Sequence, residues 1–137
     1  MQTRSSDRVA VRTEPDVIVF RGRLRELAFQ VGLSTLEQTK LITAASELVR
    51  NMLVHGGGGG VTLEVVAAGA RVGIRLTFRD EGPGIADIGR AMQDGFSTAG
   101  SLGLGLPGAK RLANEFELRS APGEGTTVII TSWKNGR

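Results

Sequence analysis

The sequence predicts an α/β fold: a two-layer sandwich in which a mixed β-sheet carries helices on one face. Two long segments before residue 56 have apolar residues at helical spacing. Two pairs of alternating or β-branched segments follow, around residues 61–78 and 116–133. Helices and paired strands in this order are typical of one helical layer packed on one sheet. The 137 residues are expected to form a single domain spanning 1–137.

The first predicted elements are a strand and a helix. Val9 and Val11 alternate with polar residues, which is the pattern of a half-buried strand. A helix is expected from Pro15 to Gly32, because proline favours a first helical turn and glycine often follows a last one. The predicted buried face of this helix consists of Val17, Phe20, Leu24, Leu27, Ala28 and Val31.

The second predicted helix is the longest element. Ser34 and Glu37 have the S-x-x-E spacing of a capping box, which places the helix start there. The helix is expected to end at the run of five glycines, Gly56–Gly60. Its predicted buried face consists of Leu41, Ala45, Leu48 and Met52.

The second half of the chain is predicted to contain strands and shorter helices. Strands are expected over residues 61–67, 71–80, 116–120 and 126–133, in two pairs with glycine-containing turns. Short helices are expected over residues 87–93 and 107–114. Residues 94–104 between them are small, polar and rich in glycine, so this loop is predicted to be mobile.

Composition excludes several classes of function. The absence of cysteine excludes disulfides, thiolate metal sites and cysteine nucleophiles, and a single histidine excludes a multi-histidine zinc site. An aromatic content of 4% is low for a protein that stacks single-stranded nucleic acid. No apolar run approaches the roughly 20 residues of a membrane span, and the first residues lack the apolar stretch of a signal peptide. A cytoplasmic protein is therefore expected.

The net charge of +3 arises in the first 25 residues, which hold six arginines and three acids. Arg21, Arg23 and Arg25 are interpreted as the solvated face of a helix, because this region otherwise has the pattern of an amphipathic helix. A nucleic-acid partner is not expected.

A polar row on the second helix is the first candidate site. Glu47, Asn51 and His55 are spaced i, i+4 and i+8, which places them along one face, and Thr43 extends the row. A carboxylate and an amide one turn apart can share a hard cation or a water, because both offer oxygen atoms. The alternative interpretation is a solvated helix surface, in which His55 only complements the helix dipole.

The segment that follows the first predicted strand pair is another candidate. Asp80 stands at a strand end, directly before a turn with Gly82 and Gly84. Backbone without Cβ atoms lets a flat ligand approach closely. The alternative interpretation is an ordinary Gly-Pro turn.

A third candidate is the string Gly103-Leu-Gly105-Leu-Pro-Gly108, which opens a predicted helix. Free N–H groups at a helix N-terminus favour phosphate. The string formally matches G-x-G-x-x-G, but a polar loop precedes it and a hairpin follows it, so a dinucleotide-binding βαβ unit is not expected. A P-loop is not expected either, because Lys110 does not directly follow Gly108.

The order of these motifs resembles that of the GHKL (Bergerat-fold) ATPases and kinases. The similar motifs are Glu47/Asn51/His55 for the N box, Asp80/Gly82/Gly84 for the G1 box, Gly103/Gly105/Gly108 for the G2 box and Gly125/Thr126/Thr127 for the G3 box. The short chain and the strings ELVRNMLVHGGGG and DGFSTAGSLGLGLPGAKRL most closely resemble the RsbT-type switch kinases of the anti-sigma regulatory factor family.

This resemblance implies an ATP- and Mg²⁺-dependent protein serine/threonine kinase. Asn51 would bind Mg²⁺, and Glu47 would act as general base toward the incoming hydroxyl. Asp80 would accept a hydrogen bond from the adenine amino group. The other implied nucleotide contacts are Gly82 and Gly84 beside the adenine, Thr126 or Thr127 beside Asp80, and Gly103, Gly105 and Gly108 at the lid and phosphates.

The resemblance also implies partners. Kinases of this type phosphorylate STAS-domain stressosome proteins, RsbS-like and RsbR-like, and once released they activate an RsbU-like PP2C-type phosphatase in sigma-factor stress signalling. The alternative is an anti-sigma factor kinase that sequesters a sigma factor and phosphorylates a STAS anti-anti-sigma factor. A detached histidine-kinase catalytic domain is a third possibility, and the lack of a recognisable phosphoacceptor helix argues against it.

Overall fold

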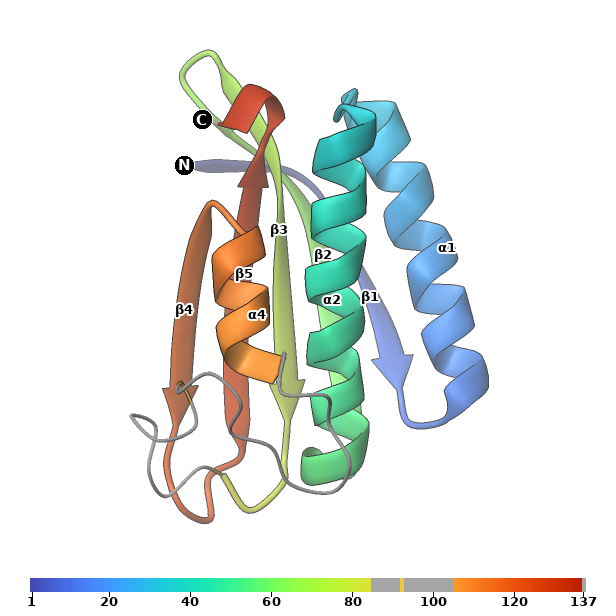
Figure 1. Cartoon of the computed structure of the whole chain (residues 1–137), viewed down its shortest axis with the longest axis vertical. Coiled ribbons are helices and arrows are strands. Elements are labelled where there is room, and N and C mark those ends of the chain that lie inside the picture. The colour runs from blue at the N-terminus through green and yellow to red at the C-terminus, as the bar shows by residue number, and fades with distance from the viewer. Residues whose placement is uncertain (85–91, 93–104, 137) are drawn as a thin grey trace.

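The strands of the computed structural model form one sheet in the order β1-β2-β3-β5-β4 (Figure 1). The structure describes residues 1–84, 92 and 105–136. Over these residues the elements are β1 (Gln2–Val11), α1 (Glu14–Val31), α2 (Thr35–Gly56), β2 (Gly59–Ala68), β3 (Arg71–Asp80), α4 (Gly105–Leu112), β4 (Glu115–Ser120), β5 (Thr126–Trp133) and the 3₁₀ turn η1 (Lys134–Gly136).

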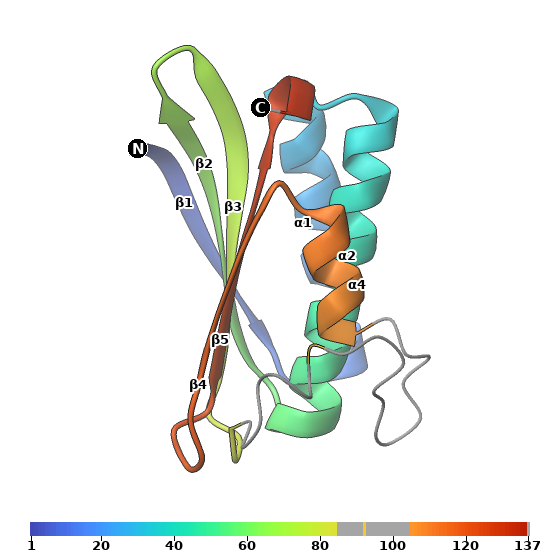
Figure 2. The same cartoon turned by 60° about the vertical axis from the view of Figure 1, so that its left-hand side comes forward.

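Helices α1, α2 and α4 all lie on one face of the sheet, and no helix of the described residues covers the other face, the bare face (Figure 2). The predicted two-layer α/β sandwich is therefore confirmed. The sheet differs from the predicted mixed sheet in one respect, because every described strand pair is antiparallel. Two helices in succession return the chain to the end of the sheet where β1 finished, so β2 runs in the opposite direction. A single crossover helix would have produced a parallel pair.

Both long helices begin at capping boxes. The predicted box of α2 is confirmed: Ser34 Oγ accepts from the Glu37 N–H at 3.1 Å, and the Glu37 carboxylate accepts from the Ser34 N–H at 2.7 Å. The latter bond lowers the pKa of Glu37. In α1, the Asp16 carboxylate accepts from the Thr13 N–H at 3.1 Å, which forms a second box. The α1 helix ends at Gly32, as predicted, in the left-handed conformation that glycine tolerates best.

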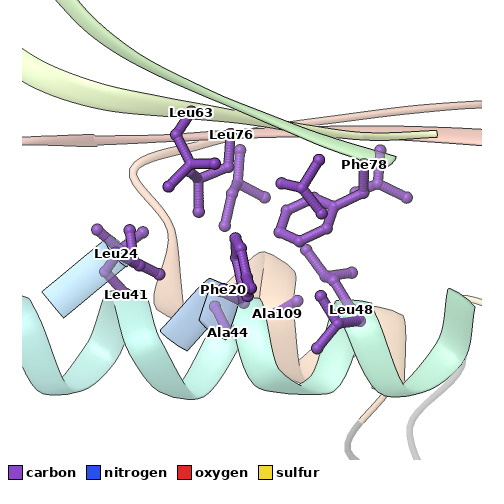
Figure 3. Packing of buried hydrophobic residues seen from close by; sticks show 14 of the residues in the cluster. Phe20, Leu24, Leu41, Ala44, Leu48, Leu63, Leu76, Phe78 and Ala109 are labelled. Carbon is purple, nitrogen blue, oxygen red and sulfur yellow. The ribbon is translucent and has the colours of Figure 1, made fainter. Parts of the chain in front are cut away.

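The core lies between the helices and the covered face of the sheet (Figure 3). Every predicted core residue of α2 is buried. The predicted core residues of α1 are buried too, except Leu27 and Val31, which are partly exposed. These helical side chains pack against Leu63 of β2 and against Leu76 and Phe78 of β3. The Phe20 and Phe78 rings meet edge to face, with centroids 6.0 Å apart. This arrangement adds about 0.5–1.5 kcal/mol beyond the area that the rings bury.

Several boundaries differ from those predicted. Strand β1 begins at Gln2, well before Val9, because residues 2–8 pair with β2 as an exposed edge strand and have no apolar alternation. Strand β2 begins inside the glycine run, at Gly59, and α4 begins at Gly105. The predicted helix over 87–93 and the predicted loop over 94–104 lie outside the described residues, Met92 excepted. In the described part of the chain, no helix is both long enough and apolar enough to cross a membrane.

Candidate active site

Asp80 is the last residue of β3, at the point where the covered face of the sheet changes from apolar to polar. Ile74, Leu76 and Phe78 alternate onto the core, and Asp80 continues the series on the same face. Its direct partners are Gly59 on β2 and Thr126 on β5, and Thr126 in turn pairs with Ser120 on β4. The carboxylate is half-buried. A polar row therefore replaces the aliphatic rows of the core at this end of the sheet.

The hydroxyl groups of this row are hydrogen-bonded to each other. Ser120 Oγ donates to the Gly125 carbonyl at 2.9 Å and lies 2.9 Å from Thr126 Oγ1. Because a serine hydroxyl has one proton, the Thr126 hydroxyl is the donor in the second bond and keeps its lone pairs for a ligand. Thr127, the other predicted candidate, pairs with Arg79 and points to the bare face. Asp80 and Thr126 are thus brought together, and Thr127 is not.

The turn after Asp80 holds the carboxylate. The Gly82 N–H donates to Asp80 Oδ1 at 2.9 Å. A Cβ on Gly82 would lie 2.6 Å from Gly56 Cα, and one on Gly84 would lie 2.8 Å from the carbonyl carbon of Ala121. Both predicted glycines therefore lie where expected, but the structure requires them for a different reason. Each leaves room for neighbouring protein backbone.

The predicted polar row on α2 is present, and its residues differ in exposure. Glu47 and Asn51 are half-buried, whereas Thr43 and His55 are exposed. Glu47 directly precedes buried Leu48, and Asn51 directly precedes buried Met52. The carboxylate and the amide therefore lie at the border between the core and the surface, one helical turn apart.

The N-terminus of α4 lies beside Asn51. A Cβ on Gly105 would be 3.7 Å from Asn51 Nδ2, and both Gly105 and Gly108 are buried. The first N–H groups of a helix have no partner within the helix, so this end of α4 offers donors next to the Asn51 amide. Gly103, the remaining glycine of this predicted motif, lies outside the described residues.

The donor set at Glu47 and Asn51 fits Mg²⁺. This ion prefers oxygen ligands, keeps several waters, and is usually held by one or two protein groups together with substrate phosphates. A carboxylate and an amide carbonyl one turn apart, beside the first N–H groups of α4, which have no partner within that helix, match that requirement.

Helix α2 connects the two polar regions. Its last residue, Gly56, contacts the Asp80 side chain, and Asn51 lies five residues earlier. At 1.5 Å per residue, the two positions are about 7.5 Å apart along the helix axis. Two residues of these regions are not apparent from the sequence: Gly56, which has the pattern of the start of a glycine run, and Ser120, which has the pattern of an ordinary strand residue. The length of the glycine run was the available signal for Gly56.

Residues 36–135 match the family described as "Histidine kinase-, DNA gyrase B-, and HSP90-like ATPase", HATPase_c. The chain belongs to this family. It is 44% identical over 125 residues to the Serine/threonine-protein kinase RsbT of Bacillus subtilis, covering 91% of this chain and 94% of that protein. It is 34% identical over 112 residues to the Anti-sigma F factor of a Thermoanaerobacter species, covering 77% of each chain.

A solved structure supports the fold of this HATPase_c protein. The crystal structure of the RsbU and RsbW domains of a Mycobacterium tuberculosis protein superposes with a TM-score of 0.62 at 21% identity. The match covers 93% of this chain and 32% of that one. The comparisons confirm the predicted GHKL membership, the use of ATP by the family, and the classification of the chain as a serine/threonine-protein kinase. The individual residue roles stay predictions.

Proposed function

We propose that this HATPase_c protein transfers the γ-phosphoryl group of ATP to a serine or threonine of a STAS-domain protein. The expected substrates are RsbS-like and RsbR-like stressosome proteins in the cytoplasm, and the released kinase then activates an RsbU-like PP2C-type phosphatase. One observation carries the proposal: α2 brings Asn51 beside the N-terminus of α4, with Glu47 one turn earlier on the same helix, while its last residue contacts Asp80. The 44% identity to a serine/threonine kinase over nearly the whole chain supports the reaction type.

The polar row at the end of the sheet suits adenine. Asp80 and Thr126 are adjacent hydrogen-bond acceptors, and the 6-amino group of adenine has two protons to donate. Guanine has a carbonyl oxygen at the same ring position, which two acceptors would repel. The site is therefore expected to bind ATP in preference to GTP, and equal affinities in calorimetry would contradict this assignment.

The phosphates would then lie between α2 and the first turn of α4. Asn51 would hold Mg²⁺, which neutralises charge on the phosphate oxygens during phosphoryl transfer. Glu47 would accept the proton of the substrate hydroxyl while the hydroxyl oxygen forms a bond to the γ-phosphorus. The bond from the γ-phosphorus to the β–γ bridging oxygen breaks, and ADP leaves with that oxygen. Positioning and charge neutralisation supply most of the catalysis in such reactions, so few side chains suffice.

The direct test is phosphotransfer from labelled ATP to purified STAS proteins in the presence of Mg²⁺. Glu47→Gln should keep nucleotide binding and lose about 10²–10⁴-fold in transfer rate, as expected when a general base is removed. Glu26→Gln on the exposed face of α1 is the matched control and should transfer at the rate of the unmodified protein. Unchanged transfer by Glu47→Gln would show that Glu47 is not the base.

The similarity to anti-sigma F factors supports a second candidate function. Those relatives are 34–35% identical to this chain, and the matches cover 68–81% of their own length. In this alternative, the chain sequesters a sigma factor and phosphorylates a STAS anti-anti-sigma factor. A pull-down with purified sigma factors distinguishes the two functions: stable capture favours the anti-sigma role, and activation of a PP2C-type phosphatase without sigma-factor binding favours the switch kinase.

A further inference from the structure

The end of α2 packs directly against the Asp80 side chain. Gly56 is the last residue of the helix and is half-buried. A Cβ on Gly56 would lie 2.6 Å from Asp80 Oδ2 and 2.7 Å from Asp80 Cβ. Both separations are shorter than van der Waals contact, so any side chain at residue 56 would displace the carboxylate.

Gly82 approaches the same carboxylate from another side. Its N–H holds Asp80 Oδ1 at 2.9 Å, and its missing Cβ leaves the space that Gly56 Cα occupies. One carboxylate oxygen is therefore fixed by a hydrogen bond, and the other lies against the helix end. Gly56, Asp80 and Gly82 form a close-packed group in which each residue limits the position of the other two.

The requirement for glycine at residue 56 is spatial and not conformational. Gly57 and Gly58 have φ angles of 72° and 95°, where side chains are strained in any surroundings. Gly56 has no positive φ and belongs to the helix. An alanine there would fit the backbone, and its methyl group would meet Asp80.

We propose that Gly56 is a positioning residue for nucleotide specificity: it sets where the Asp80 carboxylate lies relative to the Glu47 and Asn51 row on the same helix. The ligand group concerned is the 6-amino group of adenine, so the inference rests on the proposed function. Because one helix carries Gly56, Asn51 and Glu47, the base-recognising end and the phosphate end of the site are held at a constant separation.

The test compares ATP with purine riboside triphosphate, which lacks only the 6-amino group, by calorimetry on the full chain. The unmodified protein should bind ATP about 10- to 100-fold more tightly, since a hydrogen bond to a charged acceptor is lost with the analogue. Gly56→Ala should lose most of this ratio, through weaker ATP binding at nearly unchanged analogue binding. Gly22→Ala is the control, because Gly22 lies within α1 with no atom within 4 Å of the added methyl group. It should keep the full ratio.

The outcomes separate failure of the proposed function from failure of this inference. If the unmodified protein does not prefer ATP over the analogue, the adenine assignment of Asp80 fails and this inference fails with it. If the preference is present and Gly56→Ala weakens both ligands equally, Gly56 is merely structural and only this inference is overturned. If Gly56→Ala does not fold, Gly56→Ala/Asp80→Gly should fold and bind both nucleotides alike. Failure of that double variant to fold would show that the methyl group collides with something other than Asp80.

Discussion

The two faces of the sheet are built from alternate residues of the same strands and are stabilised in different ways. On the covered face, Leu76 and Phe78 pack under the helices, and the polar site begins only at Asp80. On the bare face, Arg75 and Glu64 form an ion pair at 3.0 Å between adjacent strands. The comparison shows that one strand can contribute to the core, the site and a solvated surface through its two-residue period alone.

The bare face also has a small apolar centre of its own. Trp133 is 1% exposed and lies outside the main core. It pairs with Gly73, whose missing side chain leaves room for the indole ring. The Arg71 guanidinium lies 4.0 Å over the ring, and the indole N–H donates to Glu115. Charged side chains on this face therefore cover an aromatic ring where helices cover the other face.

The largest expected difference between the faces is in stability. Leu76→Ala should lower the free energy of unfolding by about 2–5 kcal/mol, because it removes buried methyl groups and leaves a cavity. Thr77→Ala, one residue further and on the bare face, should change it by no more than about 0.5 kcal/mol. Urea denaturation of both variants measures the difference. Equal losses of unfolding free energy in the two variants would mean that Thr77 is as well packed as Leu76, so that the bare face is not a solvated surface.

The second difference is in nucleotide binding, at the next pair of alternating residues. Asp80→Asn should weaken ATP binding by about 1.5–3 kcal/mol, because a charged hydrogen-bond acceptor is replaced by a neutral amide. Arg79→Gln changes the neighbouring side chain on the opposite face, and should leave the ATP affinity as it is. Titration calorimetry measures the ATP affinity of both variants. A loss of affinity in Arg79→Gln would place nucleotide contacts on the bare face.

A smaller effect is expected where Arg71 covers Trp133. Arg71→Met keeps much of the apolar stem and removes the cation, and should cost about 0.5–1 kcal/mol of stability. Because Trp133 is the chain's one tryptophan, its fluorescence reports this site directly. An emission maximum that stays unchanged in Arg71→Met would show that the guanidinium does not cover the ring.

The smallest effect concerns pH and the Glu64–Arg75 pair. The hydrogen bond from Arg75 lowers the pKa of Glu64 below its ordinary value of 4.5, against the opposing effect of burial. A lowered folded-state pKa stabilises the fold above pH 4.5, and this contribution is lost as the pH falls through the folded pKa. The difference in unfolding free energy between the unmodified protein and Glu64→Gln should be at most about 1 kcal/mol and should shrink below that pH. If this difference in unfolding free energy grew as the pH fell, the pKa of Glu64 would be raised by folding and not lowered.

Much of the site could be predicted because the relevant rules act within one helix or one turn. The capping box at Ser34 and the face shared by Glu47 and Asn51 depend on separations of three and four residues. The position of Asp80 at a strand end follows from the apolar alternation before it and the Gly-Pro turn after it. These features need no knowledge of how the elements pack together.

The sequence by itself therefore determined the described helices and strands, most of their buried residues and the residue types of the candidate site. The tertiary structure decided the direction of the strands, the choice of Thr126 over Thr127 as the neighbour of Asp80, and the contact of Gly56 with Asp80. Gly56 and Asp80 come from different elements and meet only because α2 packs across the end of β3. Such contacts depend on the path of the whole chain, and no local spacing rule describes them. For the same reason, the glycine run appeared in the sequence as a helix end, whereas in the folded protein its first residue also packs against the Asp80 carboxylate.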